Sequence, residues 1–538
     1  MERTAAKLRM TYDYIIFNSN PSRTQKIRSV GAHRIANEIR QLGKSCLVVD
    51  YIDYITVGDY KEILKKSLGS NTKAVGFSVG WILLLDSDDR DTNKLDSTAS
   101  SELKFHERNQ QKMIGDDRLL GRMVADNFFE ELVNYAKSLY PIKVFIGGPK
   151  ALVFTEEAAP YLDYVFHGYS ENMIKDLVND MDNCPRNMNY DFKSQIGDFD
   201  FKQSATYYEK NALITSSEIL QIELSRGCKF KCKFCNFPMI GDKHAAANIK
   251  DPEVFKDELI KNYEMFGVTK YSISDDTFND SIEKVEVFAK AVRDLPFKPK
   301  FWAYIRADLL VTEPDQIPLL HEMGLAECWM GIETFTHKAG RAIGKGMHPD
   351  RIKQMLYDAK SIWGRDVMTQ SGFIIGLPYE SSYEFEENTI EFLKLKDCPL
   401  DRVGFNALHI VPPVYINTYD ILYLSEFDKN SEKYGYYFPE QNVAGRENYW
   451  KKDDDTDINS YEEAVELRNF YRPYEHGHQE FADMFRTAID YEPFMDFNNI
   501  HGKSSDEHSE LLRTMPDPSS FMKSSIRQKY VEPLLSSL

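Results

Sequence analysis

Short apolar β-type runs alternate with amphipathic stretches through most of this 538-residue chain. Parallel strands need a long crossover connection, usually a helix, so this alternation predicts parallel sheets covered by helices. A chain of this length also exceeds what one hydrophobic core usually organises. We therefore predict an α/β protein with more than one domain.

The first 190 residues are predicted to form a Rossmann-like, doubly wound domain. Its β-runs are expected at residues 13–17, 45–49, 74–78, 143–146 and 164–167, with a helix over 30–42. A polar, acidic interruption between Leu85 and Leu119 is long for a simple connection. We interpret it as a solvated insertion, with a lid as the alternative.

A second domain is predicted over residues 216–410, after a polar linker at 191–215. Its six β-runs are expected at 219–224, 270–274, 300–305, 327–331, 369–376 and 403–409. Asp251, Pro252 and Gly267 mark the start and the end of a helix between the first two. Six β/α units suffice for a partial barrel, in which catalytic groups gather at the carboxyl ends of the strands. Residues 411–538 lose the pattern and are predicted to form an α-rich C-terminal cap whose last 30 residues are peripheral.

The formal charge of −18 limits the partners of the chain. Affinity for nucleic acid comes largely from Lys and Arg that neutralise phosphates, so no nucleic-acid partner is expected. No apolar run approaches the roughly 20 residues that a membrane span needs. The first residues, Met1 to Thr4, lack the apolar core of a secretory signal. A cytoplasmic protein without a membrane span is expected.

Three of the seven cysteines, Cys228, Cys232 and Cys235, form a C-x3-C-x2-C loop directly after an expected strand. The other four are scattered, unlike a disulfide framework. Cysteine thiolates are the usual ligands of iron–sulfur clusters, and a cubane ordinarily takes four. Three in one loop would leave one iron open. A zinc site would need a fourth ligand, for which His244 is the nearby candidate, and it normally shows paired C-x2-C knuckles. The spacing therefore favours a 4Fe–4S cluster over zinc.

The loop resembles that of the radical S-adenosylmethionine (SAM) superfamily, with Phe234 in the aromatic position before the last cysteine. Four downstream segments resemble further motifs of that superfamily in the expected order, namely 274–279, 304–308, 331–334 with 344–346, and 372–378. The resemblance implies a 4Fe–4S cluster on the three cysteines, SAM at the open iron, and an external electron donor such as flavodoxin or ferredoxin.

The same resemblance implies that SAM is bound by Phe234, Asp276, Arg306, Glu333 and Gly372. Arg306 would pair with the SAM carboxylate, or instead form an ion pair with Asp308. Glu333 would accept a hydrogen bond from the SAM ribose or amine, or instead pair with a neighbouring Lys or Arg.

Asp276 is preferred over Asp275 by analogy, because strand alternation points the two side chains to opposite faces. Gly372 and Gly376 would allow close approach to the adenine, or would be ordinary strand-end turns.

The first domain resembles the cobalamin-binding domain that precedes many radical SAM domains. Segments 75–78, 145–149 and 165–171 carry this resemblance, each at the end of an expected strand. Open α/β sheets bind ligands beyond the carboxyl ends of their strands. The implied cobalamin-binding residues are Ser78, Gly147 and Gly148. The glycine pair would let a bulky cofactor approach the backbone, or would be an ordinary strand-to-helix turn.

The D-x-H-x-x-G motif, whose His ligates cobalt, is absent from this sequence. The segment after the first expected strand reads Asn-Ser-Asn-Pro-Ser at residues 18–22. Cobalamin is therefore expected to bind without a His ligand, with a cofactor-free relic of the domain as the alternative. His33 lies in the following expected helix and is interpreted as an ordinary residue of its polar face. His167 is interpreted as a core histidine with its hydrogen bonds satisfied, with approach to the corrin as the alternative.

Together the resemblances imply a transferase that generates a 5′-deoxyadenosyl radical and methylates an unactivated carbon of a small-molecule or peptide substrate with the help of cobalamin. Radical cyclisation, rearrangement or oxidation without methylation is the alternative reaction. A non-catalytic corrinoid-binding sensor is a further alternative, against which the intact cysteine loop argues. The sequence identifies neither the substrate nor a catalytic side chain.

Overall fold

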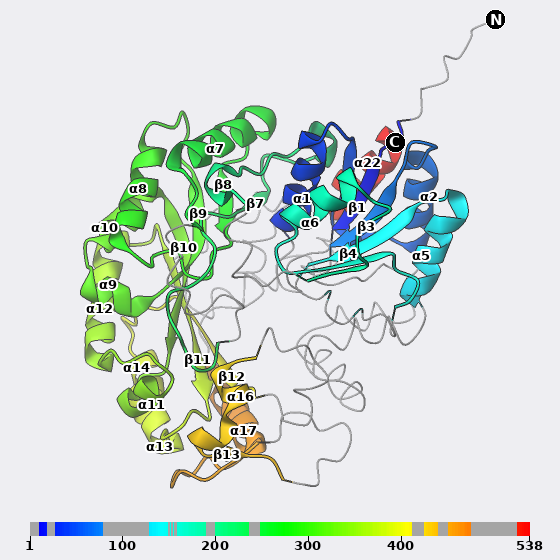
Figure 1. Ribbon diagram of the computed structural model, residues 1–538. Coiled ribbons are helices and arrows are strands. Elements are labelled where there is room, and N and C mark those ends of the chain that lie inside the picture. Colours follow the sequence, from blue (N-terminus) through cyan, green and yellow to red (C-terminus); the bar gives the residue numbers. More distant parts are fainter. Residues whose placement is uncertain are drawn as a thin grey trace, which may run out of the picture.

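A computed structural model shows two six-stranded parallel sheets, each in its own α/β domain, lying side by side (Figure 1). The structure describes residues 10–18, 27–78, 128–148, 151, 154, 159–189, 199–235, 248–410, 424–439, 450–474 and 525–538. The acidic insertion at 85–119 therefore lies outside the described residues. Within the described residues, no helix is both long and apolar enough to cross a membrane.

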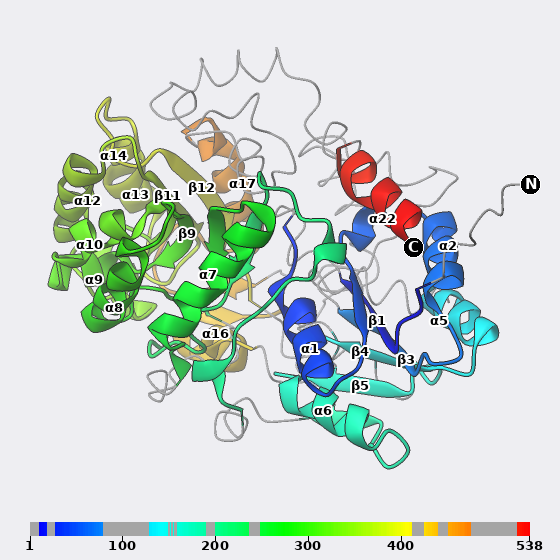
Figure 2. The ribbon, with the colours of Figure 1, turned by 90° about the horizontal axis from the view of Figure 1, so that it is seen from above.

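The sheet of the first domain has the order β2-β1-β3-β4-β5-β6, which confirms the doubly wound prediction. Its strands are β1 (Tyr14–Asn18), β2 (Cys46–Val49), β3 (Ala74–Ser78), β4 (Lys143–Gly147), β5 (Tyr164–His167) and β6 (Asn187–Asn189). Helices α1 (Val30–Gln41) and α6 (Glu171–Asn179) cover one face, and α2 (Val57–Ser67) and α5 (Phe128–Leu139) cover the other (Figure 2). Side chains alternate between these layers, because Tyr14 and Ile16 join one core while Ile15 and Phe17 join the other.

The end of the chain packs against this first domain. Residues 525–538, which include the segment Arg527–Val531 and helix α22 (Glu532–Ser537), lie beside α2 (Figure 2). They place Ile526, Tyr530 and Leu534 in the core that α2 and α5 also line. The prediction of one cap over 411–538 with a peripheral end is corrected here. Apolar residues spaced four apart give the segment a stripe that packs on a helical layer, although its serine content suggested exposure.

The sheet of the second domain has the sequential order β12-β11-β10-β9-β8-β7, which confirms the predicted six-stranded partial barrel. Its strands are β7 (Ile219–Ile222), β8 (Lys270–Ile273), β9 (Lys300–Ile305), β10 (Leu325–Glu333), β11 (Met368–Ile375) and β12 (Arg402–Ala407). The main helices are α7 (Pro252–Phe266), α8 (Ile282–Arg293), α9 (Ala307–Thr312), α10 (Gln316–Met323), α11 (His337–Ala342), α12 (Pro349–Trp363), α13 (Ser382–Phe385) and α14 (Glu391–Leu393). Helix α7 begins after the Asp251 cap and ends at Gly267 in a left-handed conformation, as predicted.

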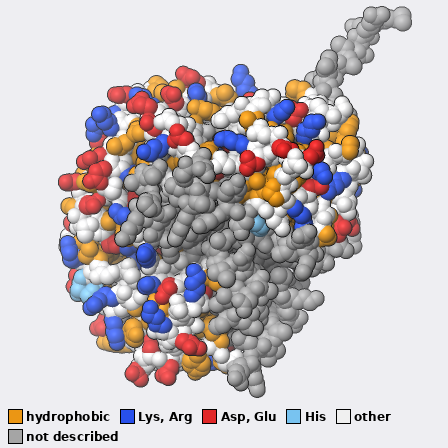
Figure 3. Space-filling model, viewed as in Figure 1, with side chains coloured by type: hydrophobic (Ala, Val, Ile, Leu, Met, Phe, Trp, Pro, Cys, Tyr) orange, Lys and Arg blue, Asp and Glu red, His pale blue; other side chains and the backbone are white. Residues whose placement is uncertain are grey.

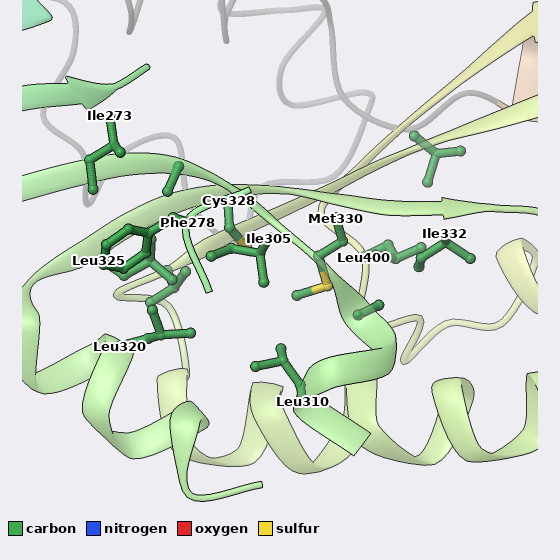
Figure 4. Close-up of a cluster of buried hydrophobic side chains, with 14 of the residues drawn as sticks. Ile273, Phe278, Ile305, Leu310, Leu320, Leu325, Cys328, Met330, Ile332 and Leu400 are labelled. Atoms are coloured by element: carbon green, nitrogen blue, oxygen red, sulfur yellow. The ribbon is translucent and has the colours of Figure 1, made fainter. Parts of the chain in front are cut away.

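The helices of the second domain lie on one face of its sheet. Figure 4 shows apolar side chains of this core, including Ile305 and Met330 from strands and Leu310 and Leu320 from helices. On β10, Cys328, Met330 and Ile332 join this core, so the alternate residues face the other side of the sheet. The carboxyl end of that face carries the predicted SAM-binding residues.

The described part of the cap contains helices α16 (Glu426–Lys429) and α17 (Tyr461–Tyr471) and a small sheet of β13 (Tyr436–Tyr437) and β14 (Lys451–Lys452). It covers the end of β11. The Tyr436 hydroxyl donates to the Gly376 carbonyl at 2.7 Å, and the Trp450 indole donates to the Leu408 carbonyl at 2.8 Å. A Cβ on Gly376 would lie 2.8 Å from the Trp450 ring, so only glycine allows this contact.

A buried arginine joins the two domains. Arg28 is 1% exposed and donates to Asp50 at 2.5 Å and to Glu218, beside β7, at 2.7 Å. The rings of Tyr51 and Tyr530 each lie 4.9 Å from its guanidinium. Arg28 also forms a parallel β-bridge with Leu220, so this segment covers the edge of the second sheet.

Replacing Arg28 by Met is expected to lower the free energy of unfolding by about 3–5 kcal/mol, because Asp50 and Glu218 would stay buried without their partner. Urea unfolding followed by tryptophan fluorescence would measure the change. Arg293→Met is the matched control, since the Arg293–Glu322 pair is 53% and 40% exposed and is worth about 1 kcal/mol or less. Equal losses in the two variants would contradict the role given to Arg28.

Candidate functional site

The cysteine loop leaves the carboxyl end of β7 and is held by backbone hydrogen bonds. The Lys233 N–H donates to Ile343 at 3.0 Å, and the Lys233 carbonyl accepts from Phe427 of the cap at 3.0 Å. All three cysteines are half-buried and carry no disulfide. His244, the alternative fourth ligand, lies outside the described residues.

Asp275 holds the start of this loop. Its carboxylate accepts from the backbone N–H groups of Leu224 and Ser225 at 2.8 and 2.9 Å and pairs with Lys284 at 3.0 Å. Asp275 and Lys284 are both buried. Lys284 also lies 3.3 Å from Asp280, so Asp275 is one of two carboxylates around this buried ammonium. The two backbone N–H groups and Lys284 together fix the carboxylate that holds the chain where it enters the loop.

Arg306, at the end of β9, contacts the loop directly. Its Nη1 lies 3.2 Å from the Cys232 sulfur, and its guanidinium lies 3.7 Å above the Phe230 ring. The same guanidinium forms a two-pronged pair with Asp308 at 2.9 and 2.5 Å. The ion pair considered as the alternative is therefore present, together with a contact that stabilises a thiolate.

The thiols are not arranged for a single metal ion. Within the described residues, no group of three His, Cys, Asp or Glu side chains converges on one point that could hold such an ion. A zinc site needs four converging ligands. In a cubane each thiolate binds a different iron, so the three sulfurs need not converge. The donor set and its spacing thus fit a cluster.

Asp276 differs sharply from its neighbour Asp275. Burial raises the pKa of the Asp276 carboxyl to about 7, and the charges of Asp275 and Glu223 add to the rise while Lys284 opposes it. A carboxyl that ionises near neutral pH and lies close to the cysteine loop is suited to meet a cationic ligand group. Asp275 is structural, and Asp276 remains the predicted binding residue.

Glu333 ends β10 with a positive φ of 71°. Its carboxylate lies 3.7 Å from the Lys345 ammonium, which also donates to the Gly331 carbonyl at 2.6 Å. A Cβ on Gly331 would lie 2.7 Å from that ammonium, so glycine makes room for the pair. Burial raises the pKa of Glu333, while Lys345 and Arg306 act to lower it. The pairing with a neighbouring Lys, which the sequence analysis considered as the alternative, is thus present.

Gly372 lies beside an indole ring. A Cβ on Gly372 would come within 3.0 Å of the Trp329 ring on the neighbouring strand, so the glycine accommodates this side chain. This contact gives Gly372 a packing role besides its predicted approach to adenine. Phe234 is partly buried and packs against the core of the second domain.

The residues predicted to bind cobalamin meet at the carboxyl ends of adjacent strands. Ser78 and Gly147 are register partners at the ends of β3 and β4. Gly148 has a φ of 110°, a conformation that favours glycine. These features fit a bulky ligand that approaches the backbone at this edge.

The two histidines of the first domain are placed as follows. His33 is 1% exposed and its ring nitrogen lies 3.0 Å from the buried Asp50. The interpretation of His33 as a polar-face residue is therefore wrong, because the side chain packs inward to pair with a buried carboxylate. His167 ends β5 and is half-buried.

The segment after β1, which lacks the cobalt-ligating His, is described only at its first residue. Asn18 donates to Asp50 at 2.7 Å, and residues 19–22 lie outside the described residues.

A charged junction that the sequence analysis missed joins the two edges. Arg226, two residues before Cys228, pairs with Glu171 beyond β5 and with Glu223 beyond β7. The Tyr169 ring lies 3.9 Å from its guanidinium. The pair of Arg226 and Glu171 joins residues far apart in sequence, so no local sequence pattern predicts it. The carboxyl ends of β5 and β7 therefore meet.

Acidic and basic side chains are interspersed over the described part of the face in Figure 3.

Comparison with known sequences identifies the second domain. Residues 222–393 match the family model of the radical SAM superfamily. The ribosomal protein uS12 methylthiotransferase RimO of Stenotrophomonas maltophilia is 26% identical over 208 residues, which are 36% of this chain and 44% of that protein. The bacteriochlorophyllide d C-8(2)-methyltransferase of Chlorobaculum tepidum is 27% identical over 121 residues, 22% of this chain and 26% of that protein. The chain thus matches less than half the length of either relative.

Comparison with solved structures extends the likeness to both domains. The radical SAM methyltransferase TsrM of Kitasatospora setae, with cobalamin and a 4Fe–4S cluster bound, superposes with a TM-score of 0.52 at 13% identity. The match covers 74% of this chain and 75% of that chain. A TsrM structure with tryptophan and a SAM analogue gives a TM-score of 0.51 at 14% identity, covering 73% of each chain. At these identities the likeness establishes the shared fold.

The two neighbouring aspartates are expected to separate loop positioning from ligand binding. Asp275→Ala should prevent reconstitution with about four irons per chain, because it removes the acceptor of the Leu224 and Ser225 N–H groups and so releases the start of the loop. Asp276→Ala should take up iron normally. Iron analysis after anaerobic reconstitution would test both, with Cys228→Ala/Cys232→Ala/Cys235→Ala as the cluster-free reference. Full iron content in Asp275→Ala would show that the loop does not depend on this carboxylate.

Proposed function

We propose that this chain is a cobalamin-dependent methyltransferase of the radical SAM superfamily, whose family model matches residues 222–393. It acts on an unactivated carbon of a small-molecule or peptide substrate. The reaction takes place in the cytoplasm and draws electrons from an external donor such as flavodoxin or ferredoxin.

The observation that carries this proposal is the meeting of the two carboxyl edges at Arg226. Arg226 lies two residues before the first cluster cysteine and contacts Tyr169 and Glu171 of the first domain. A methyltransferase that uses cobalamin and SAM together needs the two cofactors close to each other. The sheet edges that bind them must therefore meet. The TsrM structure carries cobalamin and a 4Fe–4S cluster, and the chain shares its fold.

The proposed roles follow the positions of the side chains. Cys228, Cys232 and Cys235 hold the cluster, and Arg306 stabilises the Cys232 thiolate from 3.2 Å. When bound, the cluster and SAM supply a 5′-deoxyadenosyl radical, and cobalamin supplies the methyl group.

On the SAM side, Asp276 accepts a hydrogen bond from the cationic methionyl part, and its raised pKa means that it releases a proton when that charge arrives. Glu333 accepts from the SAM ribose or amine, and Phe234 and Gly372 approach the adenine. Ser78, Gly147 and Gly148 hold cobalamin.

A methyltransferase of this kind is expected to consume two SAM molecules in each turnover. Methyl-labelled SAM and a true substrate should therefore give equal amounts of 5′-deoxyadenosine and S-adenosylhomocysteine, together with a labelled product, measured by mass spectrometry. The variant lacking all three loop cysteines serves as the control. 5′-Deoxyadenosine without S-adenosylhomocysteine or label transfer would instead indicate cyclisation, rearrangement or oxidation. Neither by-product, in the presence of bound corrinoid, would indicate a sensor.

Bound cob(II)alamin is expected to lack a protein nitrogen ligand, since His33 is held by Asp50 inside the first domain. In electron paramagnetic resonance, an axial nitrogen splits each cobalt line into three, so unsplit lines are expected. Triplets would show a nitrogen ligand, and His33→Gln would then report whether His33 supplies it. No uptake of cobalamin would overturn the cofactor assignment and leave the radical SAM domain unaffected.

A further inference from the structure

Two neighbouring strands of the second domain end in left-handed residues that are not glycine. Glu333 at the end of β10 has a φ of 71°, and Tyr379 after β11 has a φ of 61°. Non-glycine residues adopt this conformation only where surrounding contacts hold them, and such residues gather at functional sites. The contacts that hold Glu333 and Tyr379 therefore show which residues stabilise the backbone at the candidate site.

A hydrogen bond links the residues that follow these two. The Thr334 hydroxyl donates to the Glu380 carboxylate at 2.6 Å and accepts from the Thr336 N–H at 2.8 Å. Thr334 directly follows Glu333, and Glu380 directly follows Tyr379. The bond thus ties together the two left-handed turns across the sheet.

A π-helical turn forms hydrogen bonds with the loop that contains Thr334 and Thr336. Within the segment Glu386–Ile390, the Asn388 amide donates to the Thr336 hydroxyl at 3.3 Å, and the Asn388 carbonyl accepts from Lys353 at 2.8 Å. Single π-turns inside helices are rare and frequently occur at functional sites. Here the turn brings an amide to the loop that begins at Glu333.

The cap holds the other side of the network. The Tyr379 N–H donates to Asp454 at 2.6 Å, and the Ser382 N–H donates to Asp457 at 2.7 Å. Lys452 lies 3.3 Å from Asp454 and donates to the Leu377 carbonyl at 3.2 Å. The loop that carries Glu380 is therefore secured on both sides.

Glu380 is a costly residue for its position. It is 0% exposed, and its Oε2 has no hydrogen-bond partner within the described part of the chain. Burial raises the pKa of this carboxyl to about 7. The Thr336 side chain also bonds to this carboxyl, so Glu380 gathers the two threonine hydroxyls of the loop that follows Glu333. An apolar residue would fill the same space without the cost of burial, so the carboxyl is retained for these bonds.

We propose that Glu380 is a positioning residue, which acts through Thr334 to hold Glu333 in its left-handed conformation with its carboxylate directed toward the SAM site. In the structure this conformation places the Glu333 carboxylate beside Lys345, above the side-chain-free Gly331. An extended backbone at Glu333 would turn the side chain away. The inference rests on the proposed role of Glu333 in binding SAM.

The test compares Thr334→Val with the matched change Thr369→Val. Thr334 follows the carboxyl end of β10, whereas Thr369 lies at the amino end of the neighbouring strand β11. The Thr369 hydroxyl likewise is buried, lies 3.0 Å from a carboxylate (Asp401) and accepts from a backbone N–H. We expect Thr334→Val to weaken SAM binding about tenfold relative to Thr369→Val, the loss of one charge-assisted hydrogen bond. Calorimetric titration of SAM into the reconstituted protein would measure this. Iron content and unfolding midpoint should be the same in both variants.

Rescue variants exclude a merely structural effect. Thr334→Ser keeps the hydroxyl donor, and Glu380→Gln keeps an acceptor. Each of these single variants should therefore bind SAM with an affinity within about threefold of the native protein. Glu380→Leu has no acceptor and should lose SAM affinity as Thr334→Val does. Equal affinity in Thr334→Val and Thr369→Val, with both folded and loaded with iron, would overturn the proposal.

A double-mutant cycle distinguishes this proposal from the role of Glu333 itself. If Glu333→Ala alone weakens SAM binding and Thr334→Val adds nothing further, Thr334 acts through Glu333. If Glu333→Ala leaves SAM binding unchanged, the assignment of Glu333 fails, and with it the proposal. Additive losses would show that Thr334 does not act through Glu333, which refutes the positioning role while leaving Glu333 as a ligand.

Discussion

The contact of Arg226 with Glu171 and Glu223 determines how the two sheets face each other. Each sheet could form its own core without the other, but the placement of their carboxyl ends depends on this junction. The guanidinium is 6% exposed and lies against the Tyr169 ring, so both charge pairs lie away from water. Arg34 pairs with the same two glutamates, at 3.8 Å from Glu171 and 2.9 Å from Glu223, so two arginines hold the two carboxylates together. With the Arg28 contacts to Asp50 and Glu218, this network fixes how the two domains meet. Because Arg226 directly precedes Gly227 and Cys228, the junction also anchors the cysteine loop.

Acidic side chains around the loop carry out different tasks because their surroundings differ. Asp275 is satisfied by two backbone N–H groups and by Lys284, so its charge serves structure. Asp276, one residue later, lies on the opposite side of the chain, and its pKa is raised to about 7 by burial. Glu333 is held beside Lys345 by a backbone conformation that the sequence around it does not favour. Where an acidic residue lies along the sheet edge, rather than whether it is Asp or Glu, thus decides whether its carboxylate supports the structure or is available to a ligand.

Much of the fold could be predicted from the sequence, because buried parallel strands are apolar along their whole length. The expected strands at 74–78, 164–167 and 300–305 agree with β3, β5 and β9 to the residue. Strand β6, Asn187–Asn189, was missed because it is a short, polar edge strand without apolar alternation.

The cysteine loop and the strand-end residues could be predicted for a similar reason, since motif order mirrors strand order. Long-range contacts could not. Arg226 with Glu171 and Thr334 with Glu380 join residues from different strand ends, and such pairs have no local periodicity. The contrast between Asp275 and Asp276 was anticipated only as opposite directions along a strand; the identity of the partners came from the folded chain.

The return of the C-terminal segment to the first domain affects the order of events during synthesis. Tyr530 and Leu534 complete the core under α2 and α5, and the Tyr530 hydroxyl accepts from the Asp50 N–H at 2.6 Å. Domains usually fold as they emerge from the ribosome, amino-terminal part first. Here residues 526–534 join the core of the first domain only after the second domain, at residues 216–410, has been synthesised. The domain that is translated first is thus completed after the domain that follows it in the sequence.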